Sequence, residues 1–141
     1  MQKKIINLTL ITALLISPLF YNPLLTYGAE LSEIQKRGKI IVGVKDNLRP
    51  LGFKGENGQL QGLEIDIAKR LAEEILGDPN AIILQPVTNQ ERIKLLLNGS
   101  VDIVIGRMTQ THSRSRLINF SPYYYLDGTG IITKDPKIQT L

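Results

Sequence analysis

The sequence contains no cysteine, a single histidine, and no run of basic residues interleaved with aromatic ones. Without cysteine, a disulfide framework and a thiolate site are both excluded, so an apolar core must hold the fold together. His112 has no second histidine or cysteine near it in the sequence, so we expect neither a metal site nor a cofactor. The lack of a basic and aromatic stripe argues against nucleic acid as a partner.

Charged residues are also scarce at the start of the chain: after two early lysines, the next charge is Glu30. Residues 5–21 are mostly apolar, but polar residues and a proline interrupt them, whereas a membrane-spanning helix needs about 20 predominantly apolar residues. This pattern favours a signal peptide over a retained membrane anchor, with cleavage after Gly28 or Ala29. We therefore expect residues 1–29 to be a signal peptide and the mature protein to be periplasmic.

Removal of that leader leaves 112 residues, enough for one domain with a single core. The leader carries two lysines and no acid, so the formal net charge falls from +4 to +2. The charge of the whole chain therefore overstates the basicity of the mature protein.

Strands and helices are predicted to alternate along the mature chain. Apolar runs rich in β-branched residues predict strands at residues 39–44, 81–84, 101–105, 118–120 and 128–133. The expected helices cover residues 31–37, 63–76 and 89–97. The order strand, helix, strand, helix, strand is typical of an α/β fold with a parallel sheet.

Local signals refine this outline. In the second helix, Leu63, Ile67, Leu71 and Ile75 recur every four residues, with Ala68 and Ala72 beside them, and predict one apolar stripe. Asn89 is the expected cap of the third helix. Proline and glycine predict an irregular loop over residues 45–53, and the dipeptide Asn57-Gly58 predicts a hairpin turn.

Polar side chains gather in the loops after the first and third predicted strands. Because parallel strands end at the same edge of a sheet, these loops are expected to face a shared crevice, where open α/β sheets bind ligands. An arginine fork matches a carboxylate with two parallel hydrogen bonds, and a threonine adds a donor beside it. The positive charge of the crevice favours a small anion. Its expected residues are Asp46, Arg49, Phe53, Arg107, Thr109, Thr111 and Arg114.

Other polar positions have structural interpretations. Thr111 is expected to cap the turn that contains Arg114 rather than to touch a ligand. Glu64 and Asp66 lie two apart near a helix start, where they cannot converge on one ligand and where the helix dipole favours acids. Asp102 lies inside a strand pattern, and we expect it to have a structural role.

Three stretches carry motifs in a recognisable order. Residues 62–68 read Gly-Leu-Glu-Ile-Asp-Ile-Ala, close to the pattern Gly-Phe-Asp-x-Asp-Leu-Ala, and residues 99–105 fit a Gly-x-x-Asp strand. Residues 109–114 fit Thr-x-Thr-x-x-Arg, and residues 119–124, Asn-Phe-Ser-Pro-Tyr-Tyr, are close to the pattern Phe-Ser-x-Pro-Tyr. Together these motifs resemble the polar amino-acid group of bacterial extracellular solute-binding proteins, the receptors of ABC amino-acid importers. The resemblance covers residues 31–137.

The resemblance implies an α/β, parallel-sheet lobe of the type II periplasmic binding protein fold. Residues 30–134 correspond to the first amino-acid-binding lobe with its first hinge strand, and residues 135–141 to the truncated start of the segment that leads to lobe 2. The second lobe is missing from this sequence. We expect one lobe to bind weakly, since a charge-assisted contact contributes about 1.5 to 3 kcal/mol and micromolar binding requires about 8 kcal/mol.

In that family, the arginine matching Arg114 grips the α-carboxylate of the ligand, helped by the hydroxyl and amide at the Thr109 position. Arg107 occupies a position that contributes backbone groups, and Leu48 stands where an aromatic residue usually stacks on the ligand. The resemblance and the loop positions together predict a ligand-binding set of Arg114, Thr109, Arg107, Leu48, Asp46 and Phe53.

The resemblance predicts an exported substrate-binding component of an ABC-type amino-acid transporter, not an enzyme. Its partners would be a small-molecule amino acid and an ABC permease in the inner membrane, and a full-length protein would be a monomer. Leu48, Arg49 and Arg107 favour an acidic or amide ligand side chain. Two alternatives are a ligand-sensing domain of a membrane receptor and an enzyme similar to cyclohexadienyl dehydratase, in which Asp46 is the only loop acid with access to the cleft.

Overall fold

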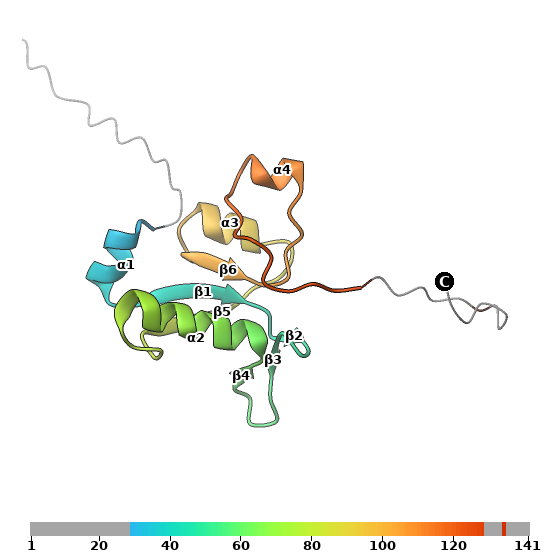
Figure 1. Ribbon diagram of the computed structural model, residues 1–141, viewed down its shortest axis with the longest axis horizontal. Coiled ribbons are helices and arrows are strands. Elements are labelled where there is room, and N and C mark those ends of the chain that lie inside the picture. The colour runs from blue at the N-terminus through green and yellow to red at the C-terminus, as the bar shows by residue number, and fades with distance from the viewer. Residues whose placement is uncertain (1–28, 129–133, 135–141) are drawn as a thin grey trace, which may run out of the picture.

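The computed structural model describes residues 29–128 and residue 134. This part of the chain has one parallel sheet and one smaller antiparallel sheet, with helices around them (Figure 1). None of its helices is both long enough and apolar enough to cross a membrane. The elements are α1 (Leu31–Arg37), β1 (Ile40–Val44), β2 (Asn47–Leu48), β3 (Gly52–Lys54), β4 (Leu60–Gln61), α2 (Leu63–Leu76), β5 (Ile82–Pro86), α3 (Arg92–Leu97), β6 (Ile103–Ile105) and α4 (His112–Ser115).

The main sheet has the strand order β5-β1-β6, and both outer strands run parallel to β1. β1 pairs with β5 along its whole length, and its last three residues pair with β6. α2 lies in the connection between β1 and β5 and packs against both strands (Figure 1). The predicted α/β fold with a parallel sheet is confirmed. The carboxyl ends of β1 and β6 therefore meet at one edge.

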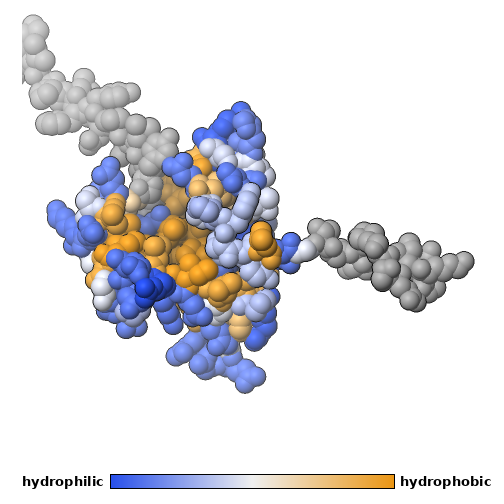
Figure 2. Space-filling model, viewed as in Figure 1, coloured by the Kyte–Doolittle hydropathy of each residue, from blue (hydrophilic) through white to orange (hydrophobic). Residues whose placement is uncertain are grey.

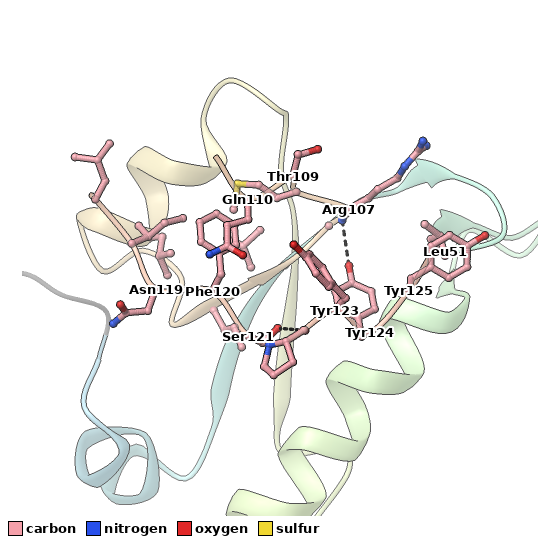
Figure 3. Close-up of a pocket in the computed structure, with 18 of the residues that line it drawn as sticks. Leu51, Arg107, Thr109, Gln110, Asn119, Phe120, Ser121, Tyr123, Tyr124 and Tyr125 are labelled. Carbon is pink, nitrogen blue, oxygen red and sulfur yellow. Dashed lines mark hydrogen bonds between the residues drawn. The ribbon is translucent and has the colours of Figure 1, made fainter. Parts of the chain in front are cut away.

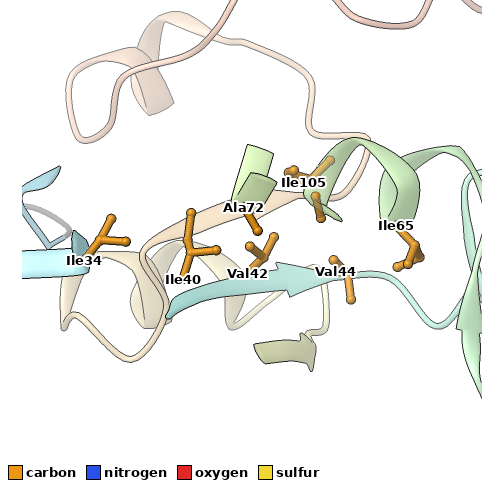
Figure 4. Close-up of a cluster of buried hydrophobic side chains, with 8 residues drawn as sticks. Ile34, Ile40, Val42, Val44, Ile65, Ala72 and Ile105 are labelled. Atoms are coloured by element: carbon orange, nitrogen blue, oxygen red, sulfur yellow. The ribbon is translucent and has the colours of Figure 1, made fainter. Parts of the chain in front are cut away.

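The core lies between one face of β1 and helix α2. Ile40, Val42 and Val44 are at most 2% exposed, and they cluster with Ile65 and Ala72 of α2 (Figure 4). The predicted stripe of α2 is confirmed at Ala72, which is fully buried, but its first member is 40% exposed and the fully buried Ile65 lies outside it. One helical turn takes 3.6 residues, so a row of residues spaced by four drifts around the helix. The spacing therefore predicted the helix and most of its buried face, but it missed Ile65.

The small sheet replaces part of the loop expected over residues 45–53. β2 pairs with β3, and β3 pairs with β4, both in antiparallel fashion. The loop prediction was wrong because the chain folds back and pairs with itself. Gly52 permits this approach, since a Cβ there would lie 2.7 Å from the carbonyl oxygen of Lys45. The predicted turn between β3 and β4 is confirmed, with a φ of 75° at Gly58.

Helix α3 begins later than predicted and is not capped by Asn89. Thr88 and Glu91 instead bond each other across the preceding turn. The Thr88 N–H donates to Oε1 of Glu91 at 3.0 Å, and the Glu91 N–H donates to Oγ1 of Thr88 at 3.3 Å. This reciprocal pair is the capping-box arrangement, and it places Arg92 in the first turn of the helix.

The chain after β6 contains no further strand within the part that the structure describes. Residues 118–120 were expected to form one, but the Ile118 N–H donates to the carbonyl of Arg114 and continues the turn after α4. The strand expected over residues 128–133 lies outside the described residues except for its first position.

Asp102 ties the start of β1 to the segment that leads into β6, which confirms its predicted structural role. Its side chain is 1% exposed and forms an ion pair with Arg37 of α1. Oδ2 of Asp102 also accepts the N–H of Ile41 at 2.7 Å. One buried carboxylate therefore fixes three segments of the chain.

The chain after α4 returns to α2 through Tyr124. The Tyr124 hydroxyl donates to Oε1 of Glu64 at 2.7 Å. Partial desolvation of the hydroxyl, and then this bond to a carboxylate, raises the pKa of Tyr124 to about 12 from 10.0. The fold therefore favours the neutral hydroxyl.

Asp102→Asn is expected to lower the free energy of unfolding by about 1 to 3 kcal/mol, because Arg37 loses its ionic partner and a charge-assisted hydrogen bond becomes neutral. Urea denaturation at neutral pH measures the change. Glu56→Gln, in the exposed turn between β3 and β4, is the control. Equal losses in the two variants would contradict the role given to Asp102.

The stability difference between the wild type and Tyr124→Phe is expected to change only at alkaline pH. Since the folded-state pKa is raised, the hydroxyl contributes fully below pH 10.0, and its contribution is lost as the pH rises towards about 12. Paired urea titrations across this interval measure the difference, with Tyr123→Phe, at a residue that is 79% exposed, as the control. A difference that stays constant up to pH 12 would refute the bond to Glu64.

Candidate functional site

The candidate site lies where β6 ends and the loop of residues 106–111 begins. Arg107 has a φ of 45°, a left-handed conformation that few residues other than glycine adopt. Its guanidinium is half-exposed and pairs with Asp127, with 3.1 Å between Nη2 and Oδ2. The Arg107 N–H is directed the other way, towards the Tyr124 hydroxyl at 3.2 Å (Figure 3). The side chain of Arg107 therefore faces solvent while its backbone faces the protein.

Two buried charged side chains contact the peptide group between Gly106 and Arg107. Arg92 of α3 is 5% exposed and donates from Nη1 to the Gly106 carbonyl at 2.7 Å. Glu64 of α2 is fully buried, and its Oε1 accepts the Arg107 N–H at 2.8 Å. Burial lowers the pKa of Arg92, the positive charge of Arg114 lowers it further, and the charge of Glu64 opposes both effects.

The sequence-based interpretation missed both of these residues. Glu64 was expected to cap the helix, where the helix dipole favours an acid. That prediction is wrong, because its carboxylate accepts the N–H of Arg107, 43 residues further along the chain. The spacing of Glu64, Ala68 and Ala72 places the acid on the buried face of α2, and this signal could have identified it. Arg92 lies four residues before Leu96, an apolar residue of α3, which is a similar signal.

The structure brings Arg114, Thr109 and Thr111 together. The Arg114 side chain donates from Nη1 to the Thr109 carbonyl at 2.8 Å. Thr111 is the N-cap of α4 and accepts the Arg114 N–H at 3.3 Å, which confirms its predicted capping role. Among the described residues, no other hydrogen bond engages the Arg114 guanidinium. This group is therefore fixed at one nitrogen and has further donors available.

The residues of the first loop are paired among themselves. Asp46 forms an ion pair with Lys54 at 3.3 Å, and the Arg49 guanidinium lies 4.0 Å from the centre of the Phe53 ring. Leu48 is half-buried in β2. In the described part of the chain, none of these side chains forms a hydrogen bond or an ion pair with the loop after β6. The structure therefore places the two predicted groups at the same sheet edge without direct polar contact.

A hollow of about 740 Å³ adjoins the loop after β6 on the side of the chain that follows α4 (Figure 3). Arg107, Thr109 and the three successive tyrosines at 123–125 lie in its wall. Seen from the direction of Figure 1, apolar side chains gather across the middle of the molecule (Figure 2). The predicted residues that do not line the hollow are Asp46, Leu48, Arg49, Phe53, Thr111 and Arg114.

The chain is similar to curated amino-acid-binding proteins. It is 47% identical over 113 residues to a glutamine-binding protein of Geobacillus stearothermophilus, an alignment that covers 79% of this chain and 43% of the relative. It is 37% identical over 105 residues to the ABC transporter glutamine-binding protein GlnH of Bacillus subtilis. This alignment covers 74% of this chain and 38% of the relative. The chain thus spans less than half the length of these relatives.

Solved structures show the same fold. The solute receptor for L-cysteine of Neisseria gonorrhoeae matches with a TM-score of 0.64 and 31% identity, over 66% of this chain and 38% of that one. The arginine-bound form of domain 1 from TmArgBP matches with a TM-score of 0.61 and 31% identity. The match covers 66% of this chain and 71% of that one. A single domain of a solute-binding protein therefore matches most of this chain.

A family model described as bacterial extracellular solute-binding proteins, family 3, matches residues 40–138. The matched range begins at β1 and includes the buried Glu64 and Arg92 as well as the loop that carries Thr109 and Arg114. The topology, the residues at the sheet edge and the similar proteins agree: the chain belongs to the bacterial extracellular solute-binding proteins of family 3.

Proposed function

We propose that the protein is the exported amino-acid-binding component of an ABC-type importer, in which Arg114 and Thr109 hold the α-carboxylate of the ligand. The observation that carries this proposal is the contact between these residues at the carboxyl edge of a parallel sheet, where open α/β sheets bind their ligands. Membership of the family and two relatives named as glutamine-binding proteins support the same ligand class.

The guanidinium of Arg114 is held in position by residues of this chain. Its bond to the Thr109 carbonyl uses one of five N–H donors, and the cap supplied by Thr111 fixes the backbone from which it extends. The remaining N–H groups match a carboxylate. The charge of Arg114 lowers the pKa of nearby Arg92, so an anion at this edge relieves repulsion between two cations.

The ligand side chain is proposed to face the first loop and to carry an amide. Lys54 balances the charge of Asp46, and Asp127 balances that of Arg107, so neither side chain offers an isolated charge to a charged ligand. Leu48 and Phe53 supply apolar surface beside them. Arg49 keeps its positive charge against the Phe53 ring, so these walls suit an amide such as that of glutamine, or an acidic group, better than a basic group.

One lobe is proposed to be sufficient for ligand binding. Counting contacts predicts weak binding, because Arg114 and Thr109 alone supply only part of the free energy that micromolar affinity requires. The structure of domain 1 from TmArgBP, described as an arginine-bound form, supports ligand binding by a single lobe. The affinity measured for this chain would therefore show how far one lobe encloses the ligand by itself.

Export through a signal peptide at residues 1–29 completes the proposal. The amino-acid-binding lobe, with its first hinge strand, would then comprise residues 30–134, and residues 135–141 would be the truncated start of the segment that leads to lobe 2. In the periplasm the protein would deliver its ligand to an ABC permease in the inner membrane. The relative GlnH, named as part of an ABC transporter, supports this partner.

An enzymatic function has less support than a binding function. An ancestral amino-acid-binding protein described as a precursor of cyclohexadienyl dehydratase matches with a TM-score of 0.55 and 40% identity. Asp46, however, forms an ion pair with Lys54, whereas a general acid must be free to exchange its proton with a substrate. A sensor domain would use the same grip on an amino acid, and transport assays separate that alternative from an importer.

Arg114→Met is expected to weaken glutamine binding by about tenfold or more, since a charge-assisted pair contributes roughly 1.5 to 3 kcal/mol. Isothermal titration calorimetry measures the affinity, and circular dichroism checks that the variant is folded. Arg116→Met, two residues away and exposed, is the matched control. Unchanged affinity in folded Arg114→Met would exclude the carboxylate grip.

The intact mass of the native protein from a periplasmic fraction is expected to correspond to a chain that begins at Ala29 or Glu30. Signal peptidase removes the leader at the small residues that precede these positions. Mass spectrometry with N-terminal sequencing identifies the first residue. A chain that retains Met1 in the membrane fraction would show that the leader is an anchor.

A further inference from the structure

One peptide group lies at the start of the loop of residues 106–111, which we call the ligand loop. Both its carbonyl and its N–H form hydrogen bonds to buried side chains. Its carbonyl belongs to Gly106 and accepts a hydrogen bond from Arg92 at 2.7 Å, and its N–H belongs to Arg107 and donates to Glu64 at 2.8 Å. Glu64 comes from α2 and Arg92 from α3, on different parts of the chain. We call this arrangement of Glu64, the 106–107 peptide and Arg92 the peptide clamp.

The charges of the clamp match the dipole of the peptide. The negative carboxylate of Glu64 faces the N–H end, and the positive guanidinium of Arg92 faces the carbonyl end. Both side chains are buried, at 0% and 5% exposure, and a buried charge is costly unless it is paired and hydrogen-bonded. Loss of either side chain leaves the other without its counter-charge, so the two act as a unit.

The clamp also stabilises an unusual backbone conformation. Arg107 has a φ of 45°, and its N–H is the group that Glu64 holds. This conformation of Arg107 sets the direction in which the backbone continues to Thr109. Arg114 bonds the carbonyl of Thr109, so the proposed carboxylate grip is connected to the clamp through three residues of backbone. Tyr124, which contacts both Glu64 and Arg107, closes the clamp from a third segment.

We propose that Glu64 and Arg92 are positioning residues that set the affinity for the amino acid by fixing the peptide between Gly106 and Arg107. Neither side chain touches the ligand in this account. They act through the backbone that presents Thr109, and the effect on affinity rests on the binding function proposed above. The bonds of the clamp involve residues of this chain alone, so the clamp can be tested without a ligand.

The first measurement is the amide signal of Arg107 by nuclear magnetic resonance, on the full chain without ligand. A bond to a carboxylate shifts an amide proton downfield and protects it from exchange. Glu64→Leu removes the acceptor, whereas Glu64→Gln keeps an acceptor of the same size without its charge. The expected order of protection is wild type, then Glu64→Gln, then Glu64→Leu. Asp66→Asn, at an exposed acid of the same helix, should leave the signal unchanged.

The second measurement is glutamine affinity in the same variants. Glu64→Leu and Arg92→Met are expected to bind about tenfold more weakly or worse, and Glu64→Gln should lie between them and the wild type. Lys94→Gln, at an exposed cation of α3, is the control for Arg92. If the two residues act as a unit, the variant that combines Glu64→Gln with Arg92→Met loses less affinity than the two single losses multiplied.

The outcomes separate the clamp from the binding function. An Arg107 amide unchanged in folded Glu64→Gln and Glu64→Leu would overturn the clamp. An amide that loses protection while glutamine affinity stays at the wild-type value would overturn the positioning role. If the wild type binds no amino acid, the proposed function fails and the affinity role fails with it, while the amide signal still confirms or overturns the clamp.

Discussion

The parallel pairing of β1 with β6 is the constraint on which the candidate site depends. It places Val44 opposite Ile105, so the two chains leave the sheet side by side at one edge. The core stabilises this pairing on one face through Val42 and Val44, and Asp102 fixes the two strands where they begin. Side chains alternate across a strand, so a shift of β6 by one residue would turn Ile105 out of the core and carry the whole ligand loop out of position.

Helix α2 connects the stability of the core to the geometry of the loop. Ile65 packs in the apolar cluster, while the neighbouring Glu64 holds the backbone of Arg107. The buried acid would be costly by itself, and it is tolerated because it receives two hydrogen bonds, from the Arg107 N–H and the Tyr124 hydroxyl. The same helix therefore stabilises the lobe and sets the direction of the loop that is proposed to bind the ligand.

Local patterns predicted the regular elements well. The helix over residues 63–76 was predicted with its observed ends, because its apolar spacing and the glycine after it are both short-range signals. The turn at Asn57-Gly58 and the cap at Thr111 were predicted for the same reason. The pairing of β2 with β3 was missed, since it depends on residues such as Gly52 that allow two backbones to approach.

The site was predictable only where its members are neighbours in sequence. Thr109, Thr111 and Arg114 lie within six residues, and the structure brings them together. The partners of Arg92 and Glu64 lie 14 and 43 residues away, and no short-range pattern specifies such contacts. The ion pair of Asp46 with Lys54 also escaped prediction, because it depends on the fold of the small sheet.

The most direct test of the account is a nuclear magnetic resonance titration of the isotope-labelled chain with glutamine. We expect saturable shifts at the Thr109 amide and at the side-chain nitrogens of Arg114, with smaller shifts at Leu48 and Phe53. Such a result would place the ligand's carboxylate at the edge where β6 ends. Shifts confined to the tyrosines at 123–125, or no shifts with any amino acid, would contradict the proposed binding site.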